Sequence, residues 1–580
     1  MHYTDVLRMI GGLSLFLFGM QVMGQALEKR AGSRLSLLIQ RLTTSRIKGL
    51  LTGLVVTAII QSSSATTVMV VGFVNSGVMS LGQAINVIMG ANIGTTTTAW
   101  LLSLVGISGT NPLIVMLKPT SFTPILAVIG VAMSFSQSEK KKDIGTMLLG
   151  FATLMFGMDT MSSAVSGLSD VPEFRQVLVA FSNPLLGLAA GAIVTGIIQA
   201  SAASVGMLQA LSLTGQVSLG IAIPIILGQN IGTCVTALLS SIGTNTNARR
   251  TAFVHFAFNV IGALVFLAAF VAGNAMMHFA FLDAPANAVS IAVVHSIFNV
   301  VSTAVLFPFV HLLERLAIMI IPEGSKAEEE GPLLDQRLLV NPPFAVARCR
   351  EVSNEMAGVA ADALTASLDA LCEYTPERAE RVRKGEDTTD RYEDVLGSYL
   401  VQLSKSPMSE GDSAEVNRML HGIGDFERIA DHAVNLVESA EELQNKGFAM
   451  SEQATRELAV LYDAVREIIG LAVEAYTTHS AQIASKVAPL EETVDALKRQ
   501  IRSRHILRLQ AGECPLPAGF VLSDLLTNLE RVSDHCQNIA DCVLDAHHRN
   551  QGIAASAIAR LSAEDFEQQL SALQVRYSLP

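Results

Sequence analysis

The first 321 residues consist of long apolar runs separated by short polar stretches. Seven runs are long enough to cross the roughly 30 Å hydrocarbon layer of a bilayer as helices, namely residues 7–27, 83–107, 112–136, 144–164, 219–243, 251–275 and 288–321. From residue 337 onward, apolar positions recur three and four residues apart among charged ones, which is typical of amphipathic helices. The pattern predicts an all-α chain in which a polytopic membrane part precedes a soluble helical bundle.

Two more apolar stretches, 48–79 and 184–214, are interrupted by polar residues near their middles. The flanks of the first interruption, at about ten residues each, are too short to span a bilayer alone. Its polar residues are Gln61, Ser62, Ser63, Ser64, Thr66 and Thr67. Uncharged polar groups at membrane depth need partners from protein, water or solute, so we interpret both stretches as re-entrant hairpins whose tips bind solute and ion. The alternative is that these hydroxyls bond to helix carbonyls, as Ser and Thr often do in membranes.

The landmarks of the first half return in the second. Phe18-Gly19-Met20 recurs as Phe156-Gly157-Met158, Gln61 recurs as Gln199, and the Asn-Ile-Gly-Thr of 92–95 recurs at 230–233, always 138 residues later (199 − 61). Interrupted segments at matching positions of two repeats are typical of a transporter binding site. We therefore predict transmembrane repeats at 1–137 and 138–276, a final transmembrane helix at 277–321, a linker at 322–340 and a helical domain at 341–580.

A second interruption in each repeat combines glycine with hydroxyl and amide side chains. The first runs from Gly90 to Thr98 and the second from Gly228 to Thr233. Glycine loosens a helix, which frees carbonyls for a cation and N–H groups for an anion. The candidate ligands here are Asn92, Thr95, Thr96, Asn230 and Thr233. Close packing of small residues between helices is the alternative.

Charge separates the two parts and predicts the topology of the first. Residues 1–321 hold 15 basic and 9 acidic residues, whereas the remainder holds 25 and 43. The positive-inside rule places the basic clusters at 29–48, 140–142 and 249–250 in the cytoplasm. Seven crossings and two hairpins satisfy this rule with the N-terminus outside and the C-terminal domain in the cytoplasm. Each repeat then crosses three times, so the second repeat is inverted relative to the first.

In these motifs the membrane part resembles the type II sodium/phosphate cotransporter family over about residues 7–310. The resemblance rests on Gln-Ser-Ser-Ser at 61–64, on the partial repeat of this motif that begins at Gln199, and on the paired Asn-Ile-Gly-Thr segments. It implies inverted-topology repeats with re-entrant hairpins, and sodium-coupled transport of inorganic phosphate by alternating access. The ligands it implies for phosphate and sodium are Gln61, Ser62, Ser63, Ser64, Thr66, Gln199, Ser201 and Ser204. We expect a multi-pass protein of the plasma (inner) membrane of a bacterium, with the lipid bilayer and no nucleic acid among its partners.

The second tip departs from the family pattern. It reads Gln199-Ala200-Ser201-Ala202-Ala203-Ser204, so two of the three serines are alanine. A site short of two hydroxyls is expected to hold fewer ions or to hold them more weakly. Neither tip contains Lys or Arg, so a phosphate anion can bind there only if cations arrive with it. Hydroxyl, amide and carbonyl oxygens suit sodium as that cation.

The soluble part repeats a pattern of acidic residues. The run Glu-Asp-Thr-Thr-Asp at 386–390 is matched by Glu-Glu-Thr-Val-Asp at 491–495, and Glu-Arg-Ile-Ala-Asp at 427–431 by Glu-Arg-Val-Ser-Asp at 530–534. The spacing predicts two similar three-helix bundles with carboxylates on facing helices. This part resembles the PhoU family of phosphate-signalling proteins, which implies iron or zinc clusters on Asp387, Asp390, Glu427, Asp431, Glu492, Asp495, Glu530 and Asp534. A solvated helix face with charges one turn apart is the alternative.

The PhoU-like tail implies control by internal phosphate or by a partner, either a second copy of the chain or a regulatory protein. We expect deletion of 337–580 to leave transport but alter its control. A phosphate exporter, or a phosphate-sensing receptor or channel, are the competing functions. An enzyme is not expected, because the first tip lacks a G-x-S-x-G setting and has no His, Asp or Lys close in sequence to act as a general base.

Overall fold

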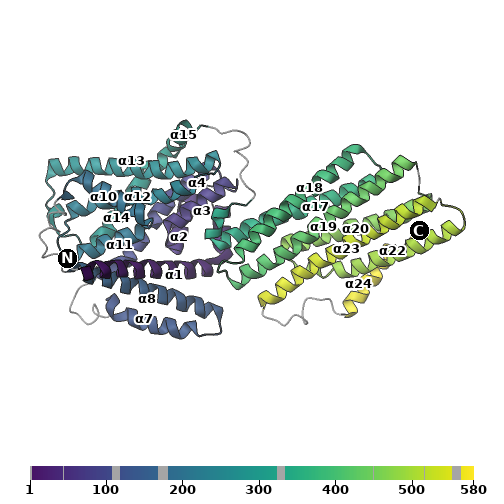
Figure 1. The fold of residues 1–580 in the computed structure, drawn as a ribbon, viewed down its shortest axis with the longest axis horizontal. Coiled ribbons are helices and arrows are strands. Elements are labelled where there is room, and N and C mark those ends of the chain that lie inside the picture. Colours follow the sequence, from purple (N-terminus) through teal and green to yellow (C-terminus); the bar gives the residue numbers. More distant parts are fainter. Residues whose placement is uncertain are drawn as a thin grey trace. The chain divides into compact units, whose positions relative to one another are not determined.

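The computed structural model describes residues 3–42, 45–106, 118–166, 180–322, 334–447, 450–514, 516–551 and 563–580. The described residues form helices joined by turns, with one isolated antiparallel bridge between Ser218 and Pro285, which confirms the all-α expectation. The chain divides into two compact units, Met1–Phe344 and Ala345–Pro580 (Figure 1).

The helices of the first unit repeat in order. The first set comprises α1 (Tyr3–Leu42), α2 (Arg46–Ile60), α3 (Ser63–Asn75), α4 (Leu81–Gly94), α5 (Thr96–Ser103) and α7 (Pro119–Ser134). The second set comprises α8 (Glu139–Ser166), α10 (Pro184–Ile198), α11 (Ser201–Ser212), α12 (Leu219–Ser240) and α13 (Thr246–Met277). After these come α14 (Ala288–Leu306), the 3₁₀ turn η4 (Phe307–Phe309), α15 (Val310–Ile320) and the 3₁₀ turn η5 (Gln336–Val340).

Five helical stretches among the described residues are long and apolar enough to cross a membrane: Tyr3–Arg30, Lys140–Val165, Leu219–Ser240, Thr246–Met277 and Ala288–Ile320. The stretch 83–107 is not one helix, because α4 ends at Gly94 and α5 begins at Thr96. The hydroxyls of Thr96 and Thr97 bond to the carbonyls of Ile93 (2.8 Å) and Gly94 (2.7 Å) across this break. Of the expected span 112–136, residues 112–117 lie outside the described part, and Ser121–Ser134 forms a short apolar helix.

Glycines allow the hairpin helices to approach their neighbours at backbone distance. A Cβ on Gly53 of α2 would lie 1.9 Å from the carbonyl oxygen of Val87 on α4, and one on Gly90 of α4 would lie 1.8 Å from that of Leu50 on α2. Between α10 and α12, Gly191 and Gly228 occupy the same positions, with Cβ atoms 2.1 and 1.9 Å from carbonyl oxygens. Small-residue packing is thus present at the second interruption of each repeat.

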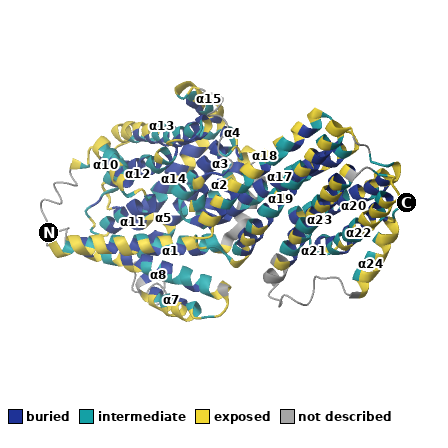
Figure 2. Cartoon of the chain, turned by 45° about the vertical axis from the view of Figure 1, so that its right-hand side comes forward, coloured by how far each residue is buried: buried dark blue, intermediate teal, exposed yellow. Residues whose placement is uncertain are grey.

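The outer helices of the first unit carry many exposed residues (Figure 2), and large apolar residues are among them. Ile193 and Ile197 on α10 are 61% and 76% exposed, and Val265 on α13 is 59% exposed. Apolar surface of this extent is unfavourable in water but suits contact with lipid. The unit therefore has the surface of a multi-pass membrane protein.

The second unit is formed mainly by long amphipathic helices: α17 (Pro342–Cys372, of which the first three residues belong to the first unit), α18 (Pro376–Leu403), α19 (Glu410–Lys446), α20 (Glu452–Thr478), the short α21 (Ala481–Ala484), α22 (Val487–Gln510), α23 (Leu516–Gln551) and α24 (Ala563–Arg576). Ser or Thr side chains cap α18, α19 and α20, and Gly447 ends α19 in the left-handed conformation (φ 65°). Arg418 of α19 lies 4.0 Å from the centroid of the Tyr476 ring of α20 and donates to the Tyr476 carbonyl at 3.2 Å, which ties α19 to α20 inside the core.

Candidate functional site

The tip of the first hairpin is a two-residue turn between α2 and α3. Gln61 ends α2 in the left-handed region (φ 59°), and its backbone N–H donates to the carbonyl of Thr57 at 2.8 Å. Ser62 is extended, and its hydroxyl accepts from the N–H of Ala65 at 3.1 Å to cap α3. A non-glycine residue with positive φ is uncommon and is often found at functional sites. The positive φ at Gln61 is an energetically unfavourable backbone conformation, and it places Gln61 and the first residues of α3 at the tip of the hairpin.

The second hairpin reproduces this geometry with different side chains. Gln199 ends α10 with φ 57°, and its N–H donates to Thr195 at 2.7 Å. Ala200 stands in the extended cap position of α11 but has no hydroxyl to cap the helix. Behind each tip, a pair of hydroxyls joins the two helices: Thr57 to Thr66 at 3.1 Å, and Thr195 to Ser204 at 2.8 Å.

The two tips face each other across one small cavity of about 40 Å³. Its lining comes from α1, both hairpins and the start of α5: Met20, Gln61, Ser62, Ser63, Ser64, Thr95, Thr98, Gln199, Ala200, Ser201 and Ala202. The hydroxyl of Ser64 also donates to the carbonyl of Gln199 at 3.5 Å. The first residues of α3 and α11 both line the cavity, and helix N-termini attract anions.

Gln61 is held in place by the threonines that follow the break after α4. The hydroxyl of Thr98 donates to Gln61 Oε1 at 2.9 Å, and Gln61 Nε2 donates to the carbonyl of Ala58 at 2.5 Å and to Thr97 Oγ1 at 3.4 Å. Thr98 and Met20 line the cavity but are not among the sequence candidates. The signals that could have found them are the run of four threonines at 95–98 and the repeated Phe-Gly-Met motif.

Seven sequence candidates do not line the cavity. Thr67 donates to the carbonyl oxygens of Ser63 and Ser64, and Thr233 donates to that of Gln229. Asn230 Nδ2 donates to the carbonyl of Ile226, while Asn92 Nδ2 is buried without a hydrogen-bond partner. Thr66 and Ser204 bond within their own hairpins, and Thr96 donates to the carbonyl of Ile93 at the end of α4. The role of these seven in ligand binding stays a prediction.

The two repeats differ at the position of Thr98. Its counterpart 138 residues later is Thr236, whose hydroxyl oxygen is buried without a hydrogen-bond partner. The helix is also continuous there, because α12 runs unbroken from Leu219 to Ser240. The first repeat thus fixes its glutamine through a side-chain hydrogen bond that the second repeat does not form.

Acidic residues of the second unit lie near one another in each bundle. Burial and then Asp387, Asp431 and Asp390 raise the pKa of Glu386. In the other bundle, burial and then Asp495 and Asp534 raise the pKa of Glu491 to about 7. Glu386 and Glu491 therefore lie close enough to candidate ligands to be repelled by their charge.

Basic residues already neutralise much of this charge. Arg428 bonds to Asp431 at 3.1 Å and approaches Glu427 at 3.4 Å. In the second bundle the pairs are Lys498 with Glu530, Arg499 with Asp495, and Arg531 with Asp534. Over the described ranges, no group of three or more His, Cys, Asp or Glu is arranged to hold a metal ion. Carboxylates are suitable ligands for iron or zinc, but these side chains do not converge on one point. Metal ligation by the eight carboxylates therefore stays a prediction.

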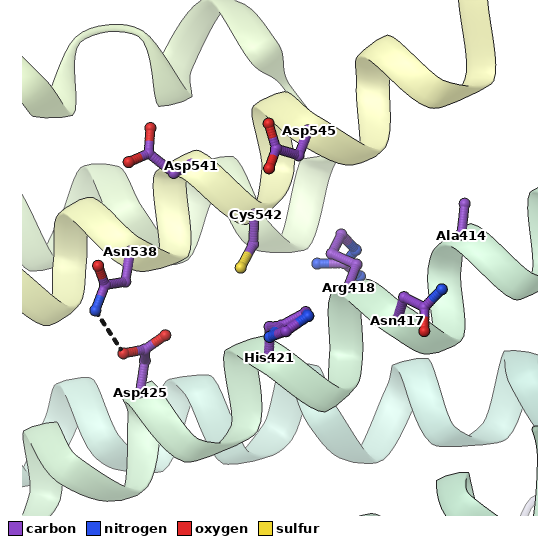
Figure 3. A pocket seen from close by; sticks show the side chains of 9 residues that line it. All are labelled: Ala414, Asn417, Arg418, His421, Asp425, Asn538, Asp541, Cys542 and Asp545. Atoms are coloured by element: carbon purple, nitrogen blue, oxygen red, sulfur yellow. Dashed lines mark hydrogen bonds between the residues drawn. The ribbon is translucent and has the colours of Figure 1, made fainter. Parts of the chain in front are cut away.

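A second cavity, of about 330 Å³, lies between α19 and α23 (Figure 3). Its lining includes His421, Asp425, Asp541, Cys542 and Asp545. Asp425 accepts from Asn538 at 3.1 Å and is paired with the His535 ring at 2.8 Å. Burial and the nearby Asp425 and Asp545 raise the pKa of Cys542 to about 11, so its thiol stays protonated at neutral pH.

Two family models match the two units separately. Residues 15–163 and 166–285 match the family model described as Na+/Pi-cotransporter, and residues 353–440 and 458–543 match the PhoU domain. "Uncharacterized protein YqeW" of Bacillus subtilis (strain 168) is 29% identical over 308 residues, covering 53% of this chain and 95% of its own length.

Two further relatives carry functional names. "Putative inorganic phosphate export protein YjbB" of Escherichia coli (strain K12) is 22% identical over 557 residues, which is 94% of this chain and 99% of that protein. "Sodium-dependent phosphate transport protein 2A" of Rattus norvegicus is 34% identical over 145 residues, which is 22% of this chain and 23% of that protein. These are transporter names rather than names of an enzyme class. The membrane unit therefore belongs to the Na+/Pi-cotransporter family, and a PhoU domain follows it in the chain.

Proposed function

We propose that the chain is a sodium-coupled inorganic phosphate transporter that works by alternating access and is regulated by its PhoU domain. The observation that carries the proposal is the single cavity lined by both hairpin tips, with the N-termini of α3 and α11 at its wall. Paired, interrupted helices from two repeats are the usual construction of a transporter site.

The cavity lining supports coupling between the anion and a cation. It offers hydroxyl, amide and backbone groups from both tips but no Lys, Arg, Asp or Glu side chain. Helix N-termini and hydroxyl donors attract phosphate, yet they carry only partial charge. Sodium ions bound by hydroxyl and carbonyl oxygens would supply the missing positive charge, so phosphate and sodium should bind together.

The size of the cavity supports a closed state of the site. At about 40 Å³ it is far smaller than ordinary ligand pockets, which measure roughly 300–1,000 Å³. Phosphate entry then requires the tips to separate from each other or from α5. Such gating around a fixed site is what alternating access demands.

Flux of radiolabelled phosphate into proteoliposomes tests the proposal. We expect saturable flux that follows a sodium gradient but not a potassium or proton gradient, and that falls in Ser64→Ala and in Gln199→Ala. Thr160→Ala is a matched control, because the Thr160 hydroxyl donates to the carbonyl of Phe156 and Thr160 does not line the cavity between the tips. Flux that does not saturate, or that ignores sodium in the intact chain, would refute sodium-coupled transport.

Phosphate export is the second candidate for the physiological direction. It is favoured by the relative named a putative phosphate export protein, which aligns over 94% of this chain, PhoU region included. The same proteoliposome system separates the two directions when phosphate is loaded inside and sodium is placed on either side. Efflux that exceeds influx at equal and opposite gradients would assign the chain to export.

Regulation is tested by removing the second unit alone. Deletion of 345–580 leaves the whole of the first unit, including the segment 334–344 that packs on it. We expect this truncation to transport phosphate but to lose its response to internal phosphate. A folded but inactive truncation would argue against a purely regulatory role.

A further inference from the structure

The segment 334–344, which we call the connecting segment, leads from the first unit to the second and is packed against the first. It contains η5 and the first residues of α17. Four of its side chains are almost completely buried: Asp335 (2% exposed), Leu338 (0%), Asn341 (1%) and Phe344 (1%). A solvated linker would expose such residues, so this segment is part of the packed structure of the first unit.

Its main contact is the end of α3 that lies farthest from the tip. Leu338 covers Gly72, on which a Cβ would lie 3.1 Å from Leu338 Cδ2. Phe344 packs edge-on against Phe73, with ring centroids 5.6 Å apart. Apolar contact therefore seats the segment on one face of α3.

Asn75, the last residue of α3, provides the polar part of the contact. Its Nδ2 donates to Asp335 Oδ2 at 2.6 Å, and its Oδ1 accepts from the backbone N–H of Asn245 at 2.7 Å. The side-chain Nδ2 of Asn245 in turn donates to the backbone carbonyl of Asn75 at 2.9 Å, while Asn245 Oδ1 accepts from the N–H of Ala248 and caps α13. One buried asparagine thus joins α3, α13 and the connecting segment.

Arg337 holds the segment to the loop after α12. It donates to the carbonyl oxygens of Ser240 (2.5 Å) and Ile242 (2.9 Å), and it pairs with Asp335 at 3.1 Å. Asp335 is consequently satisfied on both sides, by Asn75 and by Arg337. Charge-assisted hydrogen bonds of this kind are the strong ones in proteins.

The second hairpin carries no equivalent of Asn75. The residue 138 positions later is Leu213, which is 45% exposed. The polar junction, by which we mean the hydrogen bonds of Asn75 with Asp335 and Asn245, is therefore specific to the hairpin that carries the complete Gln-Ser-Ser-Ser tip.

We propose that the connecting segment is a latch that holds the first hairpin in its closed position, with Asn75 and Asp335 as its positioning residues. Helix α3 begins at the cavity with Ser63 and ends at the latch with Asn75. At 1.5 Å per residue its 13 residues span about 20 Å as one rigid rod. Movement of the tip must therefore displace Asn75, and docking of the segment must resist movement of the tip. The effect of the latch on transport rests on the proposed function, whereas the docking of the connecting segment on α3 does not.

A reversible disulfide tests the latch in the full chain. A Cβ built on Gly72 lies 3.7 Å from the Cβ of Arg337, within the roughly 3.5–4.5 Å of natural disulfides. We expect the double variant Gly72→Cys/Arg337→Cys to lose phosphate flux at least about tenfold on oxidation and to regain it on reduction, since docking strength is set by charged hydrogen bonds. Each single variant, oxidised in parallel, controls for the lost side chains. Undiminished flux with the disulfide formed would overturn the latch, and so would failure of the disulfide to form in the resting protein.

A second measurement does not depend on transport. In Gly72→Cys, the thiol should be shielded by Leu338 and react slowly with a maleimide. Adding Asp335→Ala should speed the reaction at least about tenfold by releasing the segment, whereas Asp283→Ala, an exposed carboxylate elsewhere in the unit, should not. Equal labelling rates in all three would refute the docking. If the intact chain shows no sodium-dependent flux while labelling behaves as expected, the transport proposal fails and the docking stands.

Discussion

Hairpin one, α2–α3, and hairpin two, α10–α11, have similar backbone geometry and differ in their side chains. Both turn at a glutamine with positive φ, 59° at Gln61 and 57° at Gln199, and both are braced by a hydroxyl pair behind the tip. Only the first has a serine at the cap position, a threonine bonded to its glutamine, and a polar junction at the far end of its second helix. The two repeats share the backbone geometry that presents the candidate ligand groups, while the side chains at the tips and at the far ends of α3 and α11 differ.

The largest effect should come from disrupting the close backbone packing found in both hairpins, that of α2 on α4 and of α10 on α12. Gly90→Ala and Gly228→Ala each place a Cβ within 2 Å of a backbone carbonyl oxygen, at 1.8 and 1.9 Å, with no flexible side chain to move aside. We expect each to lower the free energy of unfolding by about 3 kcal/mol or more and to abolish transport, as measured by thermal unfolding in detergent and by phosphate flux. In the control Gly11→Ala, a Cβ meets nothing within 4 Å, so it should be neutral or stabilising. If only one of the paired variants unfolds, the two packing contacts are not equivalent.

The next largest effect should come from the two glutamines. Loss of one hydrogen bond to a charged ligand slows transport by about tenfold to a hundredfold, so both Gln61→Ala and Gln199→Ala should reduce phosphate flux by this amount. Gln61→Ala should be the more severe, because Thr98 orients the Gln61 amide. Gln25→Ala on the exposed face of α1 serves as the control. Equal losses would show that the Thr98 hydrogen bond does not contribute to binding.

These features were accessible from the sequence to different degrees. The hairpins and their tips could be predicted because duplication supplies independent evidence, with Gln61 and Gln199 at one fixed spacing. Thr98 was missed because its role depends on how α5 leaves the break after Gly94. The packing of the connecting segment could not be predicted, because Asn75 and Asp335 are 260 residues apart and neither lies in a recurring pattern.

Restoring the missing serines should make the second hairpin more like the first. Ala200 already has the extended conformation of a helix cap (φ −136°), so a serine there needs no backbone change. We expect Ala200→Ser/Ala202→Ser to raise the apparent sodium affinity about threefold to tenfold, at about 0.5–1.5 kcal/mol for the added hydrogen bonds. The sodium dependence of phosphate flux measures this. Ser62→Ala/Ser64→Ala, which makes the first tip resemble the second, should shift the affinity in the opposite direction. An unchanged sodium dependence in both would mean that these hydroxyls do not bind the ion.

The smallest effect, and the finest test of the asymmetry, is the removal of one hydroxyl in each repeat. Thr98→Val leaves Gln61 Oε1 without its 2.9 Å donor, whereas Thr236→Val removes a buried hydroxyl that has no partner to lose. Because valine nearly matches threonine in shape, the difference reports the hydrogen bond rather than packing. Thr98→Val should lower phosphate flux several-fold, by about 1 kcal/mol in the transport barrier. Thr236→Val should leave flux unchanged and raise the thermal unfolding temperature slightly, because an unpaired buried hydroxyl costs stability. Equal losses of flux in the two variants would mean that Thr236 acquires a partner during the transport cycle, and the two repeats would then be functionally alike in a state other than this one.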